Sequence, residues 1–489
     1  MKVALAVTGI LLLGLGAHAT DSNAPPTVTH HALKVAGKTI NYSATAGFLP
    51  LRNDAGKLQA EIFFVAYVKD GIDSNTNRAI SFAFNGGPGA SAMWLHVGGI
   101  GPKRAAPAGN GLAAPKAYRL VDNEQTWLNF TDLVFIDPIG TGYSHTAPGV
   151  DEKQFFTIRK DVDVAGRFIR EYVTHFGRWL SPKFLVGESY GTTRAAALAN
   201  HLQSADGLNL DGVILLSSAL NFEAFSYDEG NDIAFALALP SLSVAAAYHK
   251  RATLDLQQVE NWALGDYLTD LARGDSLLGP EKKRLIEQVA EYTGLSTNYV
   301  ATSRLRVSAA RFTKELLRNE QRTIGSMDSR VVGVDVTPLG DYPDFDPAFF
   351  STTSRLVETL NDYLRYDLQF QADRPYEFLS HQVNVGWKWT EHGQGYTYVA
   401  DDLGEAMARD PKLRVFAAAG RYDLTTPYLG QRYTFDHMGL DPALRRNLTF
   451  KVYEAGHQIY SDPEAIKQLY ADVAAFVATA NGGASPSTR

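Results

Sequence analysis

The sequence predicts an α/β fold in which a mostly parallel central sheet is covered by helices. Short apolar runs each stop at a loop rich in glycine or proline, as strands buried on both faces do. Stretches with helical periodicity lie between these runs, so strands and helices alternate along the chain, which favours a parallel sheet. The runs are residues 80–84, 133–136, 184–186 and 212–216, and the intervening helices include residues 161–175 and 192–203.

The beginning of this fold differs from the rest. Residues 38–43 and 60–68 alternate or run apolar as strands, and turn residues such as Asn53, Asp54 and Gly56 separate them. We therefore expect an antiparallel meander at this end of the sheet.

The second half predicts an inserted helical cap. Amphipathic segments and an irregular stretch rich in proline and aspartate interrupt the strand pattern, which then resumes near the end of the chain. The cap segments are residues 255–272, 280–293, 308–318 and 338–349, and the later elements are strands 413–419 and 448–453 and a helix over 463–480. We expect a core at residues 20–220 and 410–480, a cap at 221–409 and a flexible tail at 481–489.

Composition limits the class of protein. The chain has 489 residues with 45% hydrophobic and 20% charged content, enough apolar material for a large core. Its formal net charge is only -7, and its acidic and basic residues are interspersed. Since nucleic-acid surfaces are basic, no nucleic-acid partner is expected, and a small or neutral partner fits better.

The first nineteen residues predict export. Lys2 precedes an apolar run over residues 3–15, and Ala17-His18-Ala19 supplies the small residues of a cleavage site. The alternative is a membrane anchor, but the run is shorter than the roughly 20 residues that span a bilayer. The chain contains no cysteine, which excludes disulfides, thiolate catalysis and cysteine-linked lipid. The simplest reading is a bacterial periplasmic or secreted protein, not membrane-bound after cleavage of residues 1–19.

The pentapeptide Gly187-Glu188-Ser189-Tyr190-Gly191 predicts a nucleophile. It follows the strand at 184–186 and opens the helix at 192, where a nucleophile elbow of an α/β-hydrolase fold lies. The alternative is an ordinary strand-to-helix turn.

A second glycine-rich loop, which begins at Asn85, follows the strand at 80–84. It allows a backbone N–H to face an oxyanion together with the amide of Tyr190, or else serves folding alone.

Asp423 and His457 predict the remaining members of a catalytic triad. Each follows one of the last two strands, so the chain order is Ser, Asp, His, as in α/β-hydrolases. Ser189 needs a base to take its proton, and His457 needs a carboxylate to fix its tautomer. The other histidines show no metal-ligand spacing beyond the pair His30-His31, so no metal or organic cofactor is expected.

With these motifs in place, the chain resembles the serine carboxypeptidases over nearly its whole mature length. The blocks that carry the resemblance are residues 84–91, 132–144, 187–191, 420–424 and 455–457. The resemblance implies an α/β-hydrolase core with a helical cap, and the removal of C-terminal residues from peptides with a free C-terminus. It also implies that Gly87 and Tyr190 form the oxyanion hole and that Asn85 and Glu188 bind the terminal carboxylate of the substrate.

Three positions depart from the family pattern. Ala83, Ala90 and Gly99 stand where many members have tryptophan, cysteine and glutamate. Without the tryptophan and the second acid, this chain lacks part of the network that binds the substrate carboxylate in the family. An acid from the cap is one candidate to replace the missing glutamate. The main alternative is an esterase or acyltransferase using the same triad, since the resemblance includes members that transfer acyl groups to alcohols. A catalytically inactive binding module is the next alternative. A prolyl aminopeptidase fits less well, because that group has histidine where this chain has Asn85. Side-chain specificity and oligomeric state stay open.

Overall fold

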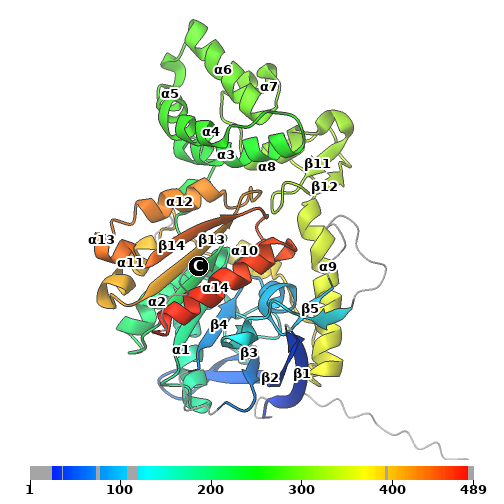
Figure 1. Cartoon of the computed structure of the whole chain (residues 1–489), viewed down its shortest axis with the longest axis vertical. Coiled ribbons are helices and arrows are strands. Elements are labelled where there is room, and N and C mark those ends of the chain that lie inside the picture. Colours follow the sequence, from blue (N-terminus) through cyan, green and yellow to red (C-terminus); the bar gives the residue numbers. More distant parts are fainter. Residues whose placement is uncertain (1–24, 36, 73–77, 107–118, 391–394, 483–489) are drawn as a thin grey trace, which may run out of the picture.

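A ten-stranded sheet forms the centre of the molecule (Figure 1). The computed structural model describes residues 25–35, 37–72, 78–106, 119–390 and 395–482. The expected signal segment at 1–19 and residues 483–489 of the expected tail lie outside these ranges. Strands follow the order β1-β2-β3-β7-β4-β9-β10-β13-β14, and β8 pairs with β3. Their bounds are β1 (Thr27–Val35), β2 (Lys38–Arg52), β3 (Leu58–Lys69), β4 (Ile80–Phe84), β7 (Asp132–Ile136), β8 (His145–Thr146), β9 (Lys183–Glu188), β10 (Gly212–Leu216), β13 (Arg414–Gly420) and β14 (Leu448–Tyr453).

The sheet changes from antiparallel to parallel partway across. Strands β1, β2 and β3 pair antiparallel, and β3 pairs antiparallel with β7. From β7 onward every pairing along the sheet is parallel, through β4, β9, β10, β13 and β14. Both the meander and the parallel region predicted from the sequence are confirmed. Parallel strands bring their carboxyl ends to one edge, so the loops after β4, β9, β13 and β14 meet there.

Helices cover both faces of the sheet. Alternate residues of β4 point to opposite faces, with Phe82 in the apolar cluster on one side and Ala83 in that on the other. The first cluster includes helices α1 (Ile158–His175), α2 (Tyr190–Ser204) and α11 (Ala400–Arg409). The second includes η1 (Trp94–Ile100), α9 (Pro347–Asp362) and α14 (Ala465–Ala480), and Figure 1 shows α14 crossing in front of the strands. This three-layer arrangement confirms the predicted α/β-hydrolase fold.

The segment between β10 and β13 contains most of the remaining helices. The predicted helix over 255–272 is three successive pieces, and the stretch expected to be irregular up to residue 349 already becomes helical at Pro347. These helices are α3 (Asp232–Tyr248), α4 (Leu256–Trp262), η5 (Ala263–Tyr267), α5 (Leu268–Ala272), α6 (Gly279–Thr293), α7 (Thr297–Thr302), α8 (Ala309–Glu315), η8 (Tyr363–Asp367) and α10 (His381–Gly386). Two short strand pairs lie outside the main sheet: β5 (Lys103–Ala105) with β6 (Leu120–Asp122), and β11 (Arg322–Ile324) with β12 (Val332–Val334). The fold is completed by the helices η2 (Trp127–Asn129), η3 (Glu152–Phe155), η4 (Phe222–Phe225), η6 (Gly274–Ser276), η7 (Arg318–Glu320), α12 (Tyr428–Asp436), α13 (Pro442–Arg445) and η9 (Ile459–Ser461).

Helices α3 to α8 stand above the sheet in Figure 1 and have an apolar cluster of their own. Members of this cluster include Leu239, Val259 and Phe312. In contrast, α9 and α11 contribute to the two clusters that flank the sheet. We therefore propose that the cap proper extends from α3 to α8, within the broader 221–409 insertion expected from the sequence.

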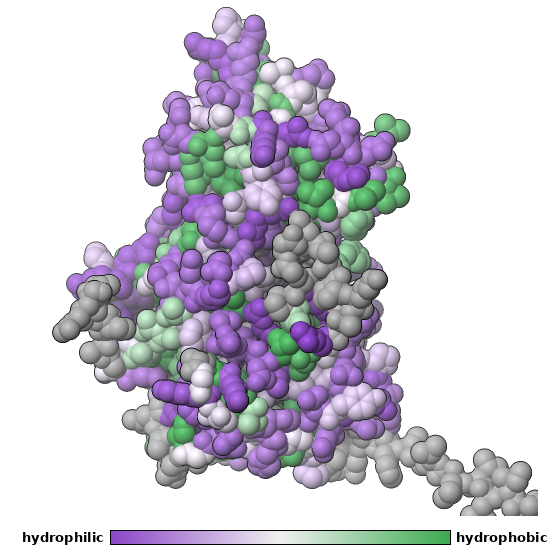
Figure 2. Space-filling view, turned by 45° about the vertical axis from the view of Figure 1, so that its right-hand side comes forward, coloured by the Kyte–Doolittle hydropathy of each residue, from purple (hydrophilic) through white to green (hydrophobic). Residues whose placement is uncertain are grey.

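The face of the molecule in Figure 2 is mainly hydrophilic. On the face in Figure 2, hydrophobic residues gather in separate groups, several of them in its upper part. Exposed apolar side chains of β12 and the loop after it include Val334, Val336 and Leu339. Within the described ranges, none of the helices combines the length and the apolar character needed to cross a bilayer.

A buried ion pair joins α8 to the residue that follows β12. Lys314 Nζ lies 2.5 Å from Asp335 Oδ1, and the two side chains are 0% and 1% exposed. Replacing Asp335 with alanine leaves a buried ammonium without its carboxylate, so we expect Asp335→Ala to lower the free energy of unfolding by about 3–5 kcal/mol. Urea denaturation followed by circular dichroism measures the change.

The matched control is Glu281→Gln, which breaks the exposed pair of Arg273 and Glu281. Exposed pairs contribute little, so this variant should unfold close to the wild type. If Asp335→Ala unfolds as the control does, the buried pair does not stabilise the cap.

Candidate active site

Ser189 lies at the sharp turn between β9 and α2. Its backbone has φ 57° and ψ -129°, a strained conformation that aims the side chain away from the sheet. The turn requires glycine on both sides: a Cβ at Gly187 would lie 2.2 Å from the carbonyl oxygen of Gly191, and one at Gly191 would lie 2.6 Å from that of Phe84. The predicted elbow is therefore present, and its two glycines permit the close approach.

His457 and Asp423 form a buried pair at the ends of β14 and β13. His457 Nδ1 lies 2.7 Å from Asp423 Oδ2, and the side chains are 3% and 0% exposed. The other carboxylate oxygen, Oδ1, accepts hydrogen bonds from the backbone amides of Thr425 at 2.8 Å and Thr426 at 2.9 Å. The hydroxyl of Thr426 donates to Oδ2 at 2.7 Å. These donors satisfy a charge that would otherwise be costly to bury.

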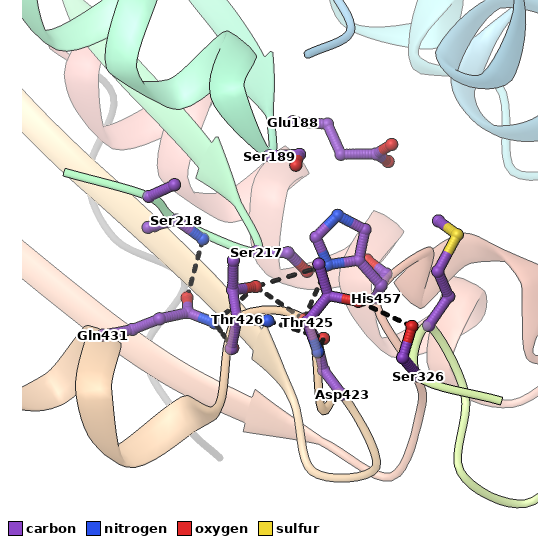
Figure 3. A network of polar contacts seen from close by, with 12 residues as sticks. Glu188, Ser189, Ser217, Ser218, Ser326, Asp423, Thr425, Thr426, Gln431 and His457 are labelled. Atoms are coloured by element: carbon purple, nitrogen blue, oxygen red, sulfur yellow. Dashed lines mark hydrogen bonds and ion pairs between the residues drawn. The ribbon is translucent and has the colours of Figure 1, made fainter. Parts of the chain in front are cut away.

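The imidazole of His457 is held so that its second nitrogen points toward Ser189 (Figure 3). The backbone N–H of His457 donates to the carbonyl of Met327 at 2.6 Å, and the backbone carbonyl of His457 accepts from the hydroxyl of Ser217 at 2.6 Å. Burial lowers the pKa of His457, but the charge and hydrogen bond of Asp423 outweigh it, with a contribution from Glu188, and the pKa ends above its ordinary value. Because Asp423 accepts from Nδ1–H, Nε2 is left free to accept a proton.

The glycine-rich loop after β4 lies against the elbow. A Cβ at Gly86 would lie 2.4 Å from the backbone nitrogen of Tyr190, so the two segments are in direct contact. Among the described residues, no oxygen accepts a hydrogen bond from the backbone N–H of Gly87 or of Tyr190. Two unpaired amides on adjoining segments beside the elbow are what an oxyanion hole needs.

Asn85 and Glu188 form a second buried pair beside Ser189. Asn85 Nδ2 donates to Glu188 Oε1 at 2.9 Å, and the amide oxygen of Asn85 accepts from the backbone of Leu95 at 3.0 Å. Arg194 holds the same loop by donating to the Asn85 carbonyl at 3.0 Å. Burial raises the pKa of Glu188 to about 7, against the lowering influence of His457, Tyr460 and Asn85. Glu188 is therefore largely protonated in mildly acidic solution and then has a proton to donate.

The structure adds two residues that the sequence reading did not single out. Thr426 binds the carboxylate of Asp423, and Tyr460 lies against Glu188. The only sign of these two residues in the sequence was their position, because Thr426 and Tyr460 each follow a candidate catalytic residue by three positions. The groups with the largest influence on Glu188 are His457, Tyr460, Asn85 and Asp423, none of which belongs to the cap. In the described part of the chain, no group of three or more acidic, histidine or cysteine side chains is arranged to hold a metal ion.

Comparison with known proteins gives consistent matches. The sequence profile described as serine carboxypeptidase matches residues 35–264. The pheromone-processing carboxypeptidase KEX1 of Saccharomyces cerevisiae is 31% identical over 166 residues, which cover 32% of this chain and 22% of that protein. Serine carboxypeptidase-like 36 of Arabidopsis thaliana is 25% identical over 220 residues, or 44% of this chain and 42% of that protein. The chain thus matches less than half the length of these relatives.

The fold extends the likeness beyond the matched sequence. The crystal structure of yeast KEX1, a prohormone-processing carboxypeptidase, superimposes with a TM-score of 0.57 at 17% identity, covering 88% of this chain and 91% of that one. At this identity the match concerns the fold alone. The sequence match covers residues 35–264, which include the glycine-rich loop and the elbow, and in this part the chain is similar to the serine carboxypeptidases.

Proposed function

We propose that this protein is a serine-type carboxypeptidase that removes C-terminal residues from peptides through an acyl-enzyme intermediate. The observation that carries the proposal is the buried Asp423–His457 pair at 2.7 Å, whose free imidazole nitrogen points toward Ser189 at the elbow. This arrangement supplies a nucleophile, a base and a group that orients the base. A peptide with a free C-terminus is the proposed substrate.

The chemistry has two halves. The Ser189 oxygen attacks the carbonyl carbon of the last peptide bond while His457 Nε2 takes the hydroxyl proton. The amides of Gly87 and Tyr190 bind the resulting oxyanion, the C–N bond breaks, and the imidazolium gives its proton to the departing amine. Water then attacks the ester, His457 takes a proton from it, and the Ser189 oxygen recovers that proton as the shortened peptide leaves.

Asn85 and Glu188 are the proposed binding site for the terminal carboxylate. An amide N–H donates to a carboxylate in any protonation state, whereas a glutamate does so only when protonated. Because the pKa of Glu188 is raised to about 7, this donor is present below pH 7 and is lost above it, where the ionised side chain repels the substrate. We expect KM for free-acid peptides to rise as the pH passes 7.

Export is the proposed location. The segment at 1–19 has the features of a cleaved signal, and the absence of cysteine fits a bacterial protein that acts in the periplasm or medium without disulfides. The yeast relative that the chain matches is a pheromone-processing enzyme by name. N-terminal sequencing of the exported protein identifies the cleavage site.

Mass spectrometry of N-blocked peptides tests the activity directly. Matched peptides with free and amidated C-termini are incubated with the purified protein between pH 4 and 8. We expect loss of C-terminal residues from the free-acid peptides only, declining above pH 7. Intact peptides alongside rapid hydrolysis of simple esters would replace this proposal with an esterase or acyltransferase on the same residues.

A further inference from the structure

Tyr460 occupies the space above two glycines of η1. Its ring covers Gly98 and Gly99 so closely that a Cβ at Gly99 would lie 3.0 Å from Tyr460 Cγ and 3.1 Å from Cδ1. Such a contact is tighter than ordinary packing, and the ring would have to shift to admit any side chain there. Gly99 is also the position at which the family often has glutamate. A side chain at position 99 therefore competes for space with the ring of Tyr460.

The hydroxyl of the same tyrosine lies at the Asn85–Glu188 pair. Tyr460 Oη interacts with Glu188 and with Asn85. The contact falls short of a well-formed hydrogen bond, since Tyr460 Oη and Glu188 Oε2 are both buried and neither has a partner of good geometry. The side chains are 2% and 4% exposed, so neither atom is satisfied by bulk water. Two interacting side chains thus each keep one buried oxygen without a partner, so the hydroxyl of Tyr460 is available to donate to Glu188 Oε2.

We propose that Tyr460 is the positioning residue that completes the carboxylate-binding site, in place of the acid that many family members carry at position 99. This inference rests on the proposed carboxypeptidase function. The phenol orients the carboxyl of Glu188 by donating to Oε2, and Glu188 in turn presents its proton to the terminal carboxylate of the substrate. No acid from the cap is needed for this role.

A neighbouring phenol and a neighbouring carboxyl shift the pKa of Glu188 in opposite directions. A neighbouring acid raises the pKa of a carboxyl by charge repulsion, whereas a hydroxyl donor lowers it by stabilising the ionised form. Around Glu188, Tyr460, Asn85 and His457 all lower its pKa, while burial and the charge of Asp423 raise it. Burial keeps the pKa of Tyr460 well above 10, so the phenol stays a neutral donor throughout the working range. The tyrosine therefore extends the ionised range of Glu188 toward lower pH.

Tyr460→Phe is the direct test, because it keeps the ring on Gly99 and removes only the hydroxyl. We expect KM for a free-acid peptide at pH 5 to rise about 3- to 10-fold, the change given by losing one modest hydrogen bond. Turnover of a small uncharged ester should stay within about 2-fold of wild type. The pH at which KM begins to rise should move upward, because the lost donor had lowered the pKa of Glu188. Tyr453→Phe, which removes a buried hydroxyl that donates to Asp472 at 2.7 Å away from the site, is the control.

Titration of Glu188 itself separates this inference from the proposed activity. Infrared difference spectroscopy in the Ser189→Ala background follows the carboxyl band, which Glu188→Gln identifies by its disappearance. We expect the midpoint to lie higher in Tyr460→Phe than in the parent, whatever substrate the enzyme uses. An unchanged midpoint together with an unchanged KM overturns the inference. If the midpoint of the Glu188 titration shifts but the protein leaves peptides intact, the contact between Tyr460 and Glu188 is supported and the proposed carboxypeptidase activity is wrong.

Exchanging the two residues provides a second test. Gly99→Glu alone places a side chain against the ring and should lower the thermal midpoint, whereas Gly99→Glu combined with Tyr460→Ala removes the clash. We expect the double variant to recover stability and to bind free-acid peptides better than Tyr460→Ala alone. If Gly99→Glu is equally stable with Tyr460 present or absent, the two positions are not coupled.

Discussion

Ser189→Ala is expected to lower kcat on the substrate by at least about 10⁴-fold while leaving the fold intact. Alanine keeps the backbone of the elbow but removes the oxygen that forms the acyl-enzyme, and the remaining groups cannot supply another nucleophile. The oxyanion amides and the binding site persist, so a small residual rate above the uncatalysed reaction should remain. Steady-state kinetics measures the loss, on the peptide or simple ester that the wild type turns over fastest.

Labelling with a fluorophosphonate probe checks the same residue without a substrate. The wild type should be labelled at Ser189 and the variant should not. Ser204→Ala, on the exposed end of the same helix, is the control and should react and turn over as the wild type does. Full turnover by Ser189→Ala would end the proposed mechanism, and a folded wild type that fails to label would indicate a binding module.

The parallel region of the fold was predictable because its strands are buried on both faces. Such strands appear as unbroken apolar runs, and the run at 80–84 coincides with β4. The elbow was predictable because of its glycines. Only glycine fits where Gly187 and Gly191 approach neighbouring carbonyls, so the steric demand is visible in the sequence.

The internal divisions of the insertion were not predictable in the same way. Apolar periodicity marks a helix as amphipathic but does not say which surface it packs against, so α11 was indistinguishable from a cap helix until its packing against α2 was seen. The stretch at 255–272 kept its apolar pattern through a π-helical segment, which changes the hydrogen-bond spacing without changing the residue types.

The partner of Glu188 could not be predicted either. The absence of an acid at Gly99 was visible as a departure from the family, but the replacement comes from a residue beyond His457 whose ring reaches back across η1. That contact joins positions far apart in the chain, and a single sequence carries no signal for such pairs. A tyrosine near a histidine is usually a packing residue, and only the interaction with Glu188 and the unsatisfied oxygen on each side chain distinguish this one.

Asp423→Asn is the second change with a large expected effect, a loss of about 10⁴-fold in kcat. The backbone amides of Thr425 and Thr426 bind Oδ1 and would retain the asparagine oxygen there. The new NH₂ group then faces His457 Nδ1, which must accept rather than donate. The proton moves to Nε2, and the histidine can no longer take the proton of Ser189.

The pH profile distinguishes this mechanism from simple damage to the site. Asp423 raises the pKa of His457, so its loss lowers that pKa, and the acid limb of kcat/KM should move to lower pH even as the maximum falls. Thr426→Ser, which keeps the hydroxyl that donates to the same carboxylate at 2.7 Å, is the conservative control and should stay near wild type. A loss of less than about 10-fold in Asp423→Asn, with an unmoved acid limb, would show that the carboxylate does not set the tautomer of His457.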